Sequence, residues 1–407
     1  MNGEIPLPIL MDGATATNLK LRGLPPKQCQ EQWILQNPQV WQQLAKEFMD
    51  AGSRMVYTPT AMANRDGLNH FGLGNQTAEI NYELARLTVQ TAREAKNHVL
   101  VAGCIAPLEI QAEPFGETPF MDIVNIYAEQ AFALKKGGVD LLVADTMTSL
   151  SQCRAAILGC RQTKLPLMVT LNVEHDGETS LGCDLVSALI VCQSLGAAAF
   201  GLSCSDQPRS IYGHLEEIAP YASIPLIAKP DAGVSFDSLL PPRQMAKDMV
   251  GLWERGAVIT GGCCYTTPAH IAAIKTEMDQ FPFHSVHLRL DTNAILIAGE
   301  TEPYFLDEFF EQSAPIICSM DMSDQLLEAE SSGADVITIQ VDTGDDAYRF
   351  ALNAHMLHLP VSFLSDNEEA LEMALLMYPG RAFVDSRSLI EEEALKTIAE
   401  GYGAIIR

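Results

Sequence analysis

The 407-residue chain is poor in basic residues, with 26 lysines and arginines against 52 aspartates and glutamates and a formal net charge of −26. Nucleic acids and anionic membranes are bound through basic surfaces, so this composition argues against both as partners. Charged residues make up only 19% of the chain and aromatic residues 7%, whereas hydrophobic residues make up 47%. Such a balance is typical of a folded globular protein with a substantial core, and it excludes extensive disorder.

The sequence also lacks long apolar runs, since no stretch approaches the roughly 18 apolar residues of a membrane span. Its start, MNGEIPLPILMDGATATNLK, has neither a basic leader nor a long apolar core, so we expect no signal peptide and a cytoplasmic protein. Ten cysteines are scattered without the spacing of a small disulfide scaffold. In a reducing compartment, a close group of cysteines is expected to be metal-binding or catalytic rather than disulfide-bonded.

Eight short apolar segments alternate with helical stretches over about the first 280 residues. Their continuous apolar runs are typical of strands buried on both faces of a parallel sheet. Eight such repeats predict an α/β protein with a (β/α)₈ TIM barrel, and a doubly wound open sheet is the alternative. The segments are IPLPILMDG, SRMVYTPTA, HVLVAGCIAP, VDLLVADTM, LPLMVTLNV, AAAFGLSCS, IPLIAKPDA and AVITGGCCY.

A shorter α/β pattern follows the eighth repeat, with predicted strands in AILIAGE, ADVITIQVD, LPVSFLSD, GRAFVDSRS and GAIIR. Four or five strands are too few for a second barrel. We therefore predict that residues 1–285 form the barrel and residues 286–407 a smaller α/β half-barrel-like domain. Because an open half-barrel has exposed sheet edges, we expect it to pack on the first barrel or on a second copy in a homodimer.

Three cysteines follow predicted barrel strands, at the end of the barrel where functional groups gather. Cys204 ends the sixth segment, and Cys263 and Cys264 end the eighth, where Gly261 and Gly262 allow the chain to leave strand geometry. Three thiolates favour Zn²⁺ and leave one of its four positions for a substrate. A thiol bound there loses its proton and becomes a nucleophile. The alternative is three ordinary core cysteines, since free cysteine is often buried.

The stretch GGCCYTTPAHI closely resembles the Gly-Gly-Cys-Cys-Gly-Thr-Thr-Pro motif of the homocysteine S-methyltransferase family. MDGATATNL, VAGCIAP and GLSCS resemble further motifs of this family, so the resemblance spans about residues 5–280. It implies a (β/α)₈ barrel, Zn²⁺ on Cys204, Cys263 and Cys264, and methyl transfer to a thiol, with homocysteine as the first candidate. A corrinoid and a methyl-folate, each supplied in trans, are candidate donors, and the sequence does not identify the donor. A corrinoid would need a separate carrier protein, because the chain has no Asp-x-His-x-x-Gly cobalamin motif.

The same resemblance implies which residues surround the substrate. Asp12 and Gly13 match the positions that hold the amino acid end of homocysteine, and Asp145 stands where the family usually has Glu. Ser203 replaces an Asn before the first zinc cysteine, and Tyr265 replaces a Gly after the last one. We expect these five residues to contact the substrate or line its pocket. Asp12 and Asp145 could instead end a strand and cap a helix.

One further departure lies on the seventh strand, where Asp231 replaces the usual Asn. Such changes put the identity of the thiol in question but leave the metal–thiolate chemistry intact. Two other functions fit the same residues. The protein could be a demethylase that passes a methyl group from a methylated substrate to a corrinoid protein, or a non-catalytic zinc-binding subunit of a methyl-transfer complex.

Residues from about 290 to 407 resemble, more weakly, the first half of a pterin-binding domain. The polar residues expected after its strands mostly differ, since Thr338 and Gln340 replace Asp and Asn, and Asp385 replaces Asn. The second half of that domain is missing from this pattern. We therefore expect a structural or docking role here rather than folate binding by this piece alone.

Overall fold

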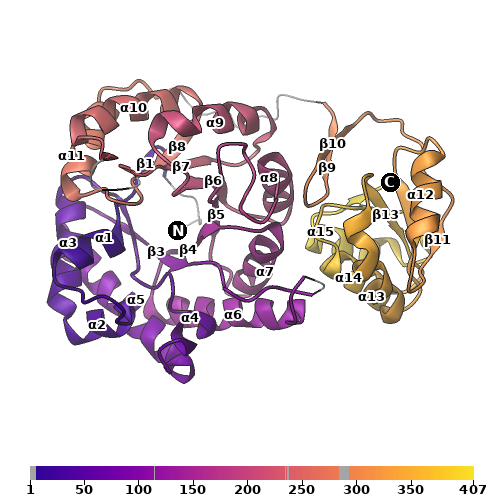
Figure 1. The fold of residues 1–407 in the computed structure, drawn as a ribbon, viewed down its shortest axis with the longest axis horizontal. Helices are drawn as coiled ribbons and strands as arrows, with labels where there is room; N and C mark the ends of the chain where they lie inside the picture. Colours follow the sequence, from indigo (N-terminus) through magenta and orange to yellow (C-terminus); the bar gives the residue numbers. More distant parts are fainter. Residues whose placement is uncertain (1–5, 114, 234, 236–237, 284–292) are drawn as a thin grey trace.

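The computed structural model describes residues 6–113, 115–233, 235, 238–283 and 293–407. The first part is a ring of strands surrounded by helices, and a smaller α/β part lies beside it (Figure 1). The predicted boundary between residues 285 and 286 lies outside the described residues. The exact residue at which the two domains divide therefore stays a prediction.

The eight predicted segments of the first part form one parallel sheet in the order β1-β8-β7-β6-β5-β4-β3-β2. A bridge between Met11 and Met55 joins β1 to β2, and the amide of Arg54 donates to the carbonyl of Leu10 at 2.8 Å. The sheet is therefore closed, which confirms the (β/α)₈ barrel and excludes the open sheet. Its strands are β1 (Ile9–Leu10), β2 (Met55–Tyr57), β3 (Leu100–Ile105), β4 (Leu141–Met147), β5 (Leu167–Leu171), β6 (Ala199–Ser203), β7 (Leu226–Lys229) and β8 (Ala257–Thr260).

Helices cover the outside of this barrel (Figure 1). Successive side chains of a strand point to opposite faces, so each barrel strand fills the interior with one set of residues and contacts the helices with the other. The helices are α1 (Thr15–Leu21), α2 (Gln30–Gln36), α3 (Pro38–Asp50), α4 (Arg65–Asn69), α5 (Thr77–Arg93), α6 (Phe120–Gly137), α7 (Leu150–Arg161), α8 (Leu185–Ser194), α9 (Tyr212–Ile218), α10 (Pro242–Glu254) and α11 (Pro268–Met278).

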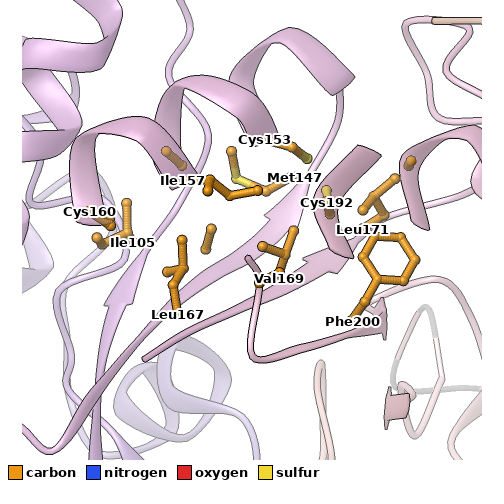
Figure 2. Packing of buried hydrophobic residues seen from close by; sticks show 14 of the residues in the cluster. Ile105, Met147, Cys153, Ile157, Cys160, Leu167, Val169, Leu171, Cys192 and Phe200 are labelled. Atoms are coloured by element: carbon orange, nitrogen blue, oxygen red, sulfur yellow. The ribbon is translucent and has the colours of Figure 1, made fainter. Parts of the chain in front are cut away.

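The layer between the sheet and the helices is the larger of the barrel's two apolar cores. Figure 2 shows a section of it, in which side chains of α7 lie over alternate residues of β5. The smaller core fills the barrel interior below the strand ends. The labelled residues of the section are Ile105, Met147, Cys153, Ile157, Cys160, Leu167, Val169, Leu171, Cys192 and Phe200.

The second part contains a five-stranded parallel sheet in sequential order, as expected for half of a barrel. One predicted strand of this part lies outside the parallel sheet. AILIAGE forms β9 (Ile295–Ala298), which pairs antiparallel with β10 (Pro303–Leu306) in a separate hairpin. The sheet consists of β11 (Ile316–Ile317), β12 (Ile337–Gln340), β13 (Val361–Leu364), β14 (Phe383–Val384) and β15 (Ile405–Ile406), with α12 (Ser323–Ser331), α13 (Gly344–Asn353), α14 (Glu368–Met377) and α15 (Glu392–Gly401).

The second part packs against the barrel at α7 and α8 (Figure 1). Arg154 of α7 donates to the carbonyls of Leu375 and Leu376, and the rings of Tyr221 and Phe305 lie 4.8 Å apart. This contact fits the expectation of docking on the first barrel, while the homodimer stays a prediction. None of the helices in the described ranges is long and apolar enough to cross a membrane.

Substitution of Phe200 in β6 tests how much the packed core contributes to the free energy of unfolding. Its side chain is fully buried, so Phe200→Ala should lower the free energy of unfolding by about 3–5 kcal/mol through lost burial and a residual cavity. Phe309 is 90% exposed, and Phe309→Ala should change this free energy by less than about 0.5 kcal/mol. Urea denaturation of both variants measures the difference, and equal losses would contradict the packing described.

Candidate metal and substrate site

The three predicted cysteines meet at the carboxyl end of the barrel. Cys204 directly follows β6, and Cys263 and Cys264 follow β8 after two glycines. Strand β7 lies between β6 and β8, and it fixes both loops: the amide of Cys204 donates to the carbonyl of Lys229, and the amide of Cys263 donates to the carbonyl of Pro230. The other seven cysteines are buried, whereas these three are partly exposed, so the core-cysteine alternative does not fit.

Gly261 and Gly262 have a different role from the one expected. Neither adopts a positive φ; a Cβ on Gly261 would lie 2.8 Å from the carbonyl oxygen of Asp12, and one on Gly262 would lie 2.5 Å from Oγ1 of Thr266. The glycines therefore allow β8 to pass close to β1 and to the following loop. The left-handed conformation occurs one residue after the cysteines, at Tyr265 with φ +61°.

Cys204 and Cys263 are joined by a disulfide, and Sγ of Cys264 lies 3.7 Å from Sγ of Cys204. The expectation that all cysteines are reduced does not hold for this pair. Closure of the barrel brings sulfur atoms 59 residues apart in the sequence to one point, where they can form a disulfide or, when reduced, bind one ion together. Convergence of the three sulfurs is thus as predicted, whereas their oxidation state is not.

Asp231 is the fourth member of this cluster. One ligand atom from each of Cys204, Asp231, Cys263 and Cys264 can be chosen so that all lie within 4.8 Å of one another. The amide of Cys264 donates to Oδ1 of Asp231 at 2.8 Å. Burial raises the pKa of Asp231 to about 7, and burial followed by the charge of Asp231 raises the pKa of Cys264 to about 11. The protein groups alone therefore disfavour a thiolate here, and a cation would reverse this.

A pocket of about 510 Å³ opens beside the cluster. Cys263 and Cys264 form part of its wall, together with Gly13, Asp145 and Lys229. Further residues that line it include Tyr57, Thr58, Pro59, Ala61, Met62, Phe71 and Cys104. The pocket thus places a possible ligand against both sulfur atoms and charged groups of opposite sign.

Lys229 is the residue of this pocket that sequence reasoning missed. Lys229 is the last residue of β7, and its side chain is 5% exposed. Its Nζ lies 3.7 Å from Oδ1 of Asp12 and 3.6 Å from the centre of the Tyr57 ring. A lysine with this little exposure requires a compensating charge or aromatic face, and it has both. The only signal in the sequence is a charged residue inside the apolar run IPLIAKPDA.

Asp12 lies beneath this lysine and is 1% exposed. Its Oδ2 accepts a hydrogen bond from the amide of Tyr57 at 2.9 Å, whereas Oδ1 has no hydrogen-bond partner among the described residues. Burial raises the pKa of Asp12 to about 6, and the charge of Lys229 opposes this rise. Asp12 is therefore placed to hold Lys229 rather than to line the pocket itself.

Asp145 reaches the pocket from a distorted part of β4. The register against β5 shifts between Ala144 and Met147, and Thr146 has φ +58°. Such bulges redirect a side chain at a strand end. Oδ1 of Asp145 accepts a hydrogen bond from Oγ1 of Thr170 at 2.8 Å, which fixes the carboxylate at the pocket wall.

Ser203 and Tyr265 lie next to the cluster but outside the described lining of the pocket. Ser203 is fully buried, and its hydroxyl has no hydrogen-bond partner in the described ranges. Tyr265 is partly buried against the main core. Their expected contact with substrate stays a prediction.

Comparison of the sequence with known protein families shows to which family the chain belongs. Residues 9–278, well over half of the chain, match the family described as "Homocysteine S-methyltransferase". The chain belongs to this family. Membership in the family supports the prediction of a methyltransferase. The family match ends before the residues that resemble a pterin-binding domain, so that second resemblance stays a prediction.

Two relatives of the family member described here are methionine synthases of Mycobacterium leprae (strain TN) and Mycobacterium tuberculosis (strain ATCC 25618 / H37Rv). They are 27% identical over 287 residues and 28% identical over 289 residues. Each alignment covers 65% of this chain but 24% of the relative, so the chain matches about a quarter of those proteins.

Solved structures of the homocysteine methyltransferase MmuM from Escherichia coli share the barrel fold of this family member. The oxidized form is 23% identical and the metallated form 22% identical, each with a TM-score of 0.56. Both alignments cover 66% of this chain and 95% of the solved chain. At this identity the likeness supports the fold alone.

The burial of Asp12 predicts a pH dependence of stability. Its pKa of about 6 exceeds the ordinary value of 3.8, so its contribution to stability is complete below about pH 4 and is lost as the pH rises through about 6. The difference between these two pKa values corresponds to about 3 kcal/mol of unfolding free energy. Between pH 4 and 7, wild type should therefore lose about 2 kcal/mol of unfolding free energy relative to Asp12→Asn.

Urea denaturation across this pH range measures the effect. Asp307→Asn, at an exposed position, is the matched control and should follow wild type. Parallel pH profiles of wild type and Asp12→Asn would show that burial does not raise the pKa of Asp12.

Proposed function

We propose that the protein is a zinc-dependent S-methyltransferase that methylates a thiol, with homocysteine as the acceptor and methionine as the product. One observation carries this proposal: three sulfur atoms and one carboxylate converge beside a pocket that also presents a lysine and an aspartate. The sulfur cluster suits a metal that binds a thiol, and the lysine and aspartate suit the two charges of an amino acid. Family membership supports the same reaction.

The donor set fits Zn²⁺, which binds cysteine sulfur and carboxylate oxygen in tetrahedral sites. In the reduced protein, Cys204, Cys263 and Cys264 would hold the ion, and Asp231 is the nearest further donor. Bound Zn²⁺ would supply the positive charge that keeps a substrate thiol deprotonated at neutral pH. Before substrate enters, Asp231 would supply the remaining ligand of the ion.

The remaining charged groups would orient the substrate. Lys229 lines the pocket and would bind the carboxylate of homocysteine, while Asp145 would bind its ammonium group. Asp12 would act through Lys229, because its Oδ1 faces Nζ and its side chain is buried below the pocket. This assignment differs from the sequence-based expectation, in which Asp12 contacted the substrate directly.

The methyl donor would approach from the outer part of the pocket. Met62 and Phe71 line this part and are 42% and 47% exposed, which leaves an apolar surface in contact with solvent. A methylated corrinoid on another protein, or a methyl-folate, would have to reach the substrate sulfur past these side chains. The donor thus remains a molecule supplied in trans.

Metal content tests the cluster. Reduced wild-type protein should bind about one zinc ion per chain, and Cys264→Ala should lose most of this zinc together with methyl transfer to homocysteine, because a structural thiolate ligand is removed. Plasma emission spectroscopy measures the zinc, and formation of methionine from homocysteine with a methylated corrinoid or a methyl-folate measures activity.

Cys318→Ala is the matched control, since this buried cysteine lies in the second part of the chain, and it should keep both zinc and activity. Full activity of metal-free protein would contradict the proposed mechanism. Zinc binding without transfer from any donor would favour a binding subunit instead.

Substrate analogues test the two charged groups separately. Lys229→Met should raise KM for homocysteine about tenfold or more, because a charged hydrogen bond to the carboxylate is lost. KM for homocysteamine, which lacks the carboxylate, should stay unchanged. Asp145→Asn should show the reverse pattern, with a raised KM for homocysteine and no change for gamma-mercaptobutyrate, which lacks the ammonium group.

Steady-state kinetics with the three thiols provides the measurement, and each variant serves as the control for the other. If Lys229→Met raises KM for homocysteine and KM for homocysteamine equally, Lys229 does not bind the carboxylate.

A further inference from the structure

A second cavity, of about 430 Å³, lies between the barrel and the second part of the chain. It shares no lining residue with the pocket beside the cysteines. The loop after β3 and the first turns of α7 form most of its barrel side. The turn of the β9–β10 hairpin, the end of α13 with the segment after it, and the segment after α14 form the other side. Its volume lies within the range of small-molecule sites, which often occur between domains.

Arg154 of α7 supplies a positive charge to this cavity. The residue is 2% exposed, and its Nη2 donates to the carbonyls of Leu375 and Leu376 at 2.9 and 3.1 Å. Its Nε is buried and has no acceptor among the described residues. A buried guanidinium N–H without an acceptor is unfavourable, and an anionic oxygen in the cavity would satisfy it.

Glu300, in the hairpin turn, supplies a negative charge to the same cavity. It is partly buried, and burial raises the pKa of its carboxyl group above the ordinary value, while the charge of Arg154 opposes this. Arg154 and Glu300 do not form an ion pair with each other in the described part of the chain. Arg154 and Glu300 therefore face one cavity without neutralising each other directly, and Glu113 is a further carboxylate of its wall.

Between these charges the walls are largely apolar and aromatic. Phe120 lies 5.4 Å from the guanidinium carbon of Arg154, measured to the ring centre. Tyr304 and Tyr378 come from the second part of the chain, and Phe115 of the barrel contacts His355 of that part edge-on at 6.4 Å. Rings on both sides favour a ligand with a flat or flexible apolar body.

We propose that this cavity binds a free α-amino acid with a large apolar or aromatic side chain, its carboxylate on Arg154 and its ammonium group on Glu300. The chemistry follows from the two separated charges and the apolar walls between them. A singly charged ligand would leave one of the two groups unsatisfied. The proposal does not depend on the methyltransferase reaction, because the two cavities are distinct.

Isothermal titration of the full chain with L-methionine, L-phenylalanine and L-tryptophan tests this site. At least one of them should bind saturably, and Glu300→Gln should weaken that binding about tenfold or more, because the charged contact to the ammonium group is lost. The N-acetyl and methyl ester forms of the same amino acid, each lacking one charge, should bind wild type correspondingly less well.

Glu302→Gln is the matched control, since Glu302 is an exposed residue of the same turn that does not line the cavity, and it should bind as wild type does. Asp145→Asn should also bind normally, which separates this cavity from the pocket in the barrel. Arg154→Lys should weaken binding; because it could also disturb the contact with α14, Glu300→Gln is the deciding variant.

Three results would overturn the proposal. One is no saturable binding of any of the three amino acids up to about 5 mM. Another is binding that Glu300→Gln leaves unchanged, in which case Arg154 only fastens α14 to the barrel. The third is binding that Asp145→Asn abolishes, because the ligand would then occupy the barrel pocket.

Discussion

The register of three neighbouring strands, β6, β7 and β8, decides where the sulfur atoms of this protein meet. Backbone hydrogen bonds from the loops after β6 and β8 both end on carbonyls at the end of β7. The loops cannot separate while these bonds hold, so Cys204 and the cysteine pair share one point of the rim. The positions of the three sulfur atoms and of Asp231 follow from this shared anchoring on β7.

A single buried lysine organises the electrostatics of the same region. Lys229 faces Asp12 and the ring of Tyr57, lowers the pKa of Asp12 and acts in the same direction on Cys264. Without it, the carboxylates of the pocket would face one another with no positive charge between them. The carboxyl end of the barrel therefore combines several acidic groups with one buried basic group, which is the charge pattern that the proposed function uses.

Much of this arrangement could be predicted from the sequence because it depends on strand order alone. Continuous apolar runs predicted the eight strands, and cysteines at the ends of two of them predicted the cluster. The role of Lys229 could not be predicted, because a lysine at a strand end is normally at the surface, whereas this one shares the inward face of β7 with the buried Ile227. Likewise AILIAGE has the pattern of a parallel strand, and only the tight turn from Gly299 to Glu302 makes it half of a hairpin.

The carboxylates of the pocket also bear on the form in which the proposed thiol substrate would enter. Asp145 lines the pocket, Asp231 adjoins the sulfur cluster, and the chain as a whole carries a net charge of −26. This field would repel an anionic sulfur from solution but not the neutral S–H form. In the proposed reaction the thiol would therefore lose its proton inside the barrel, and the supply of acceptor would depend on total thiol and not on the small ionised fraction outside.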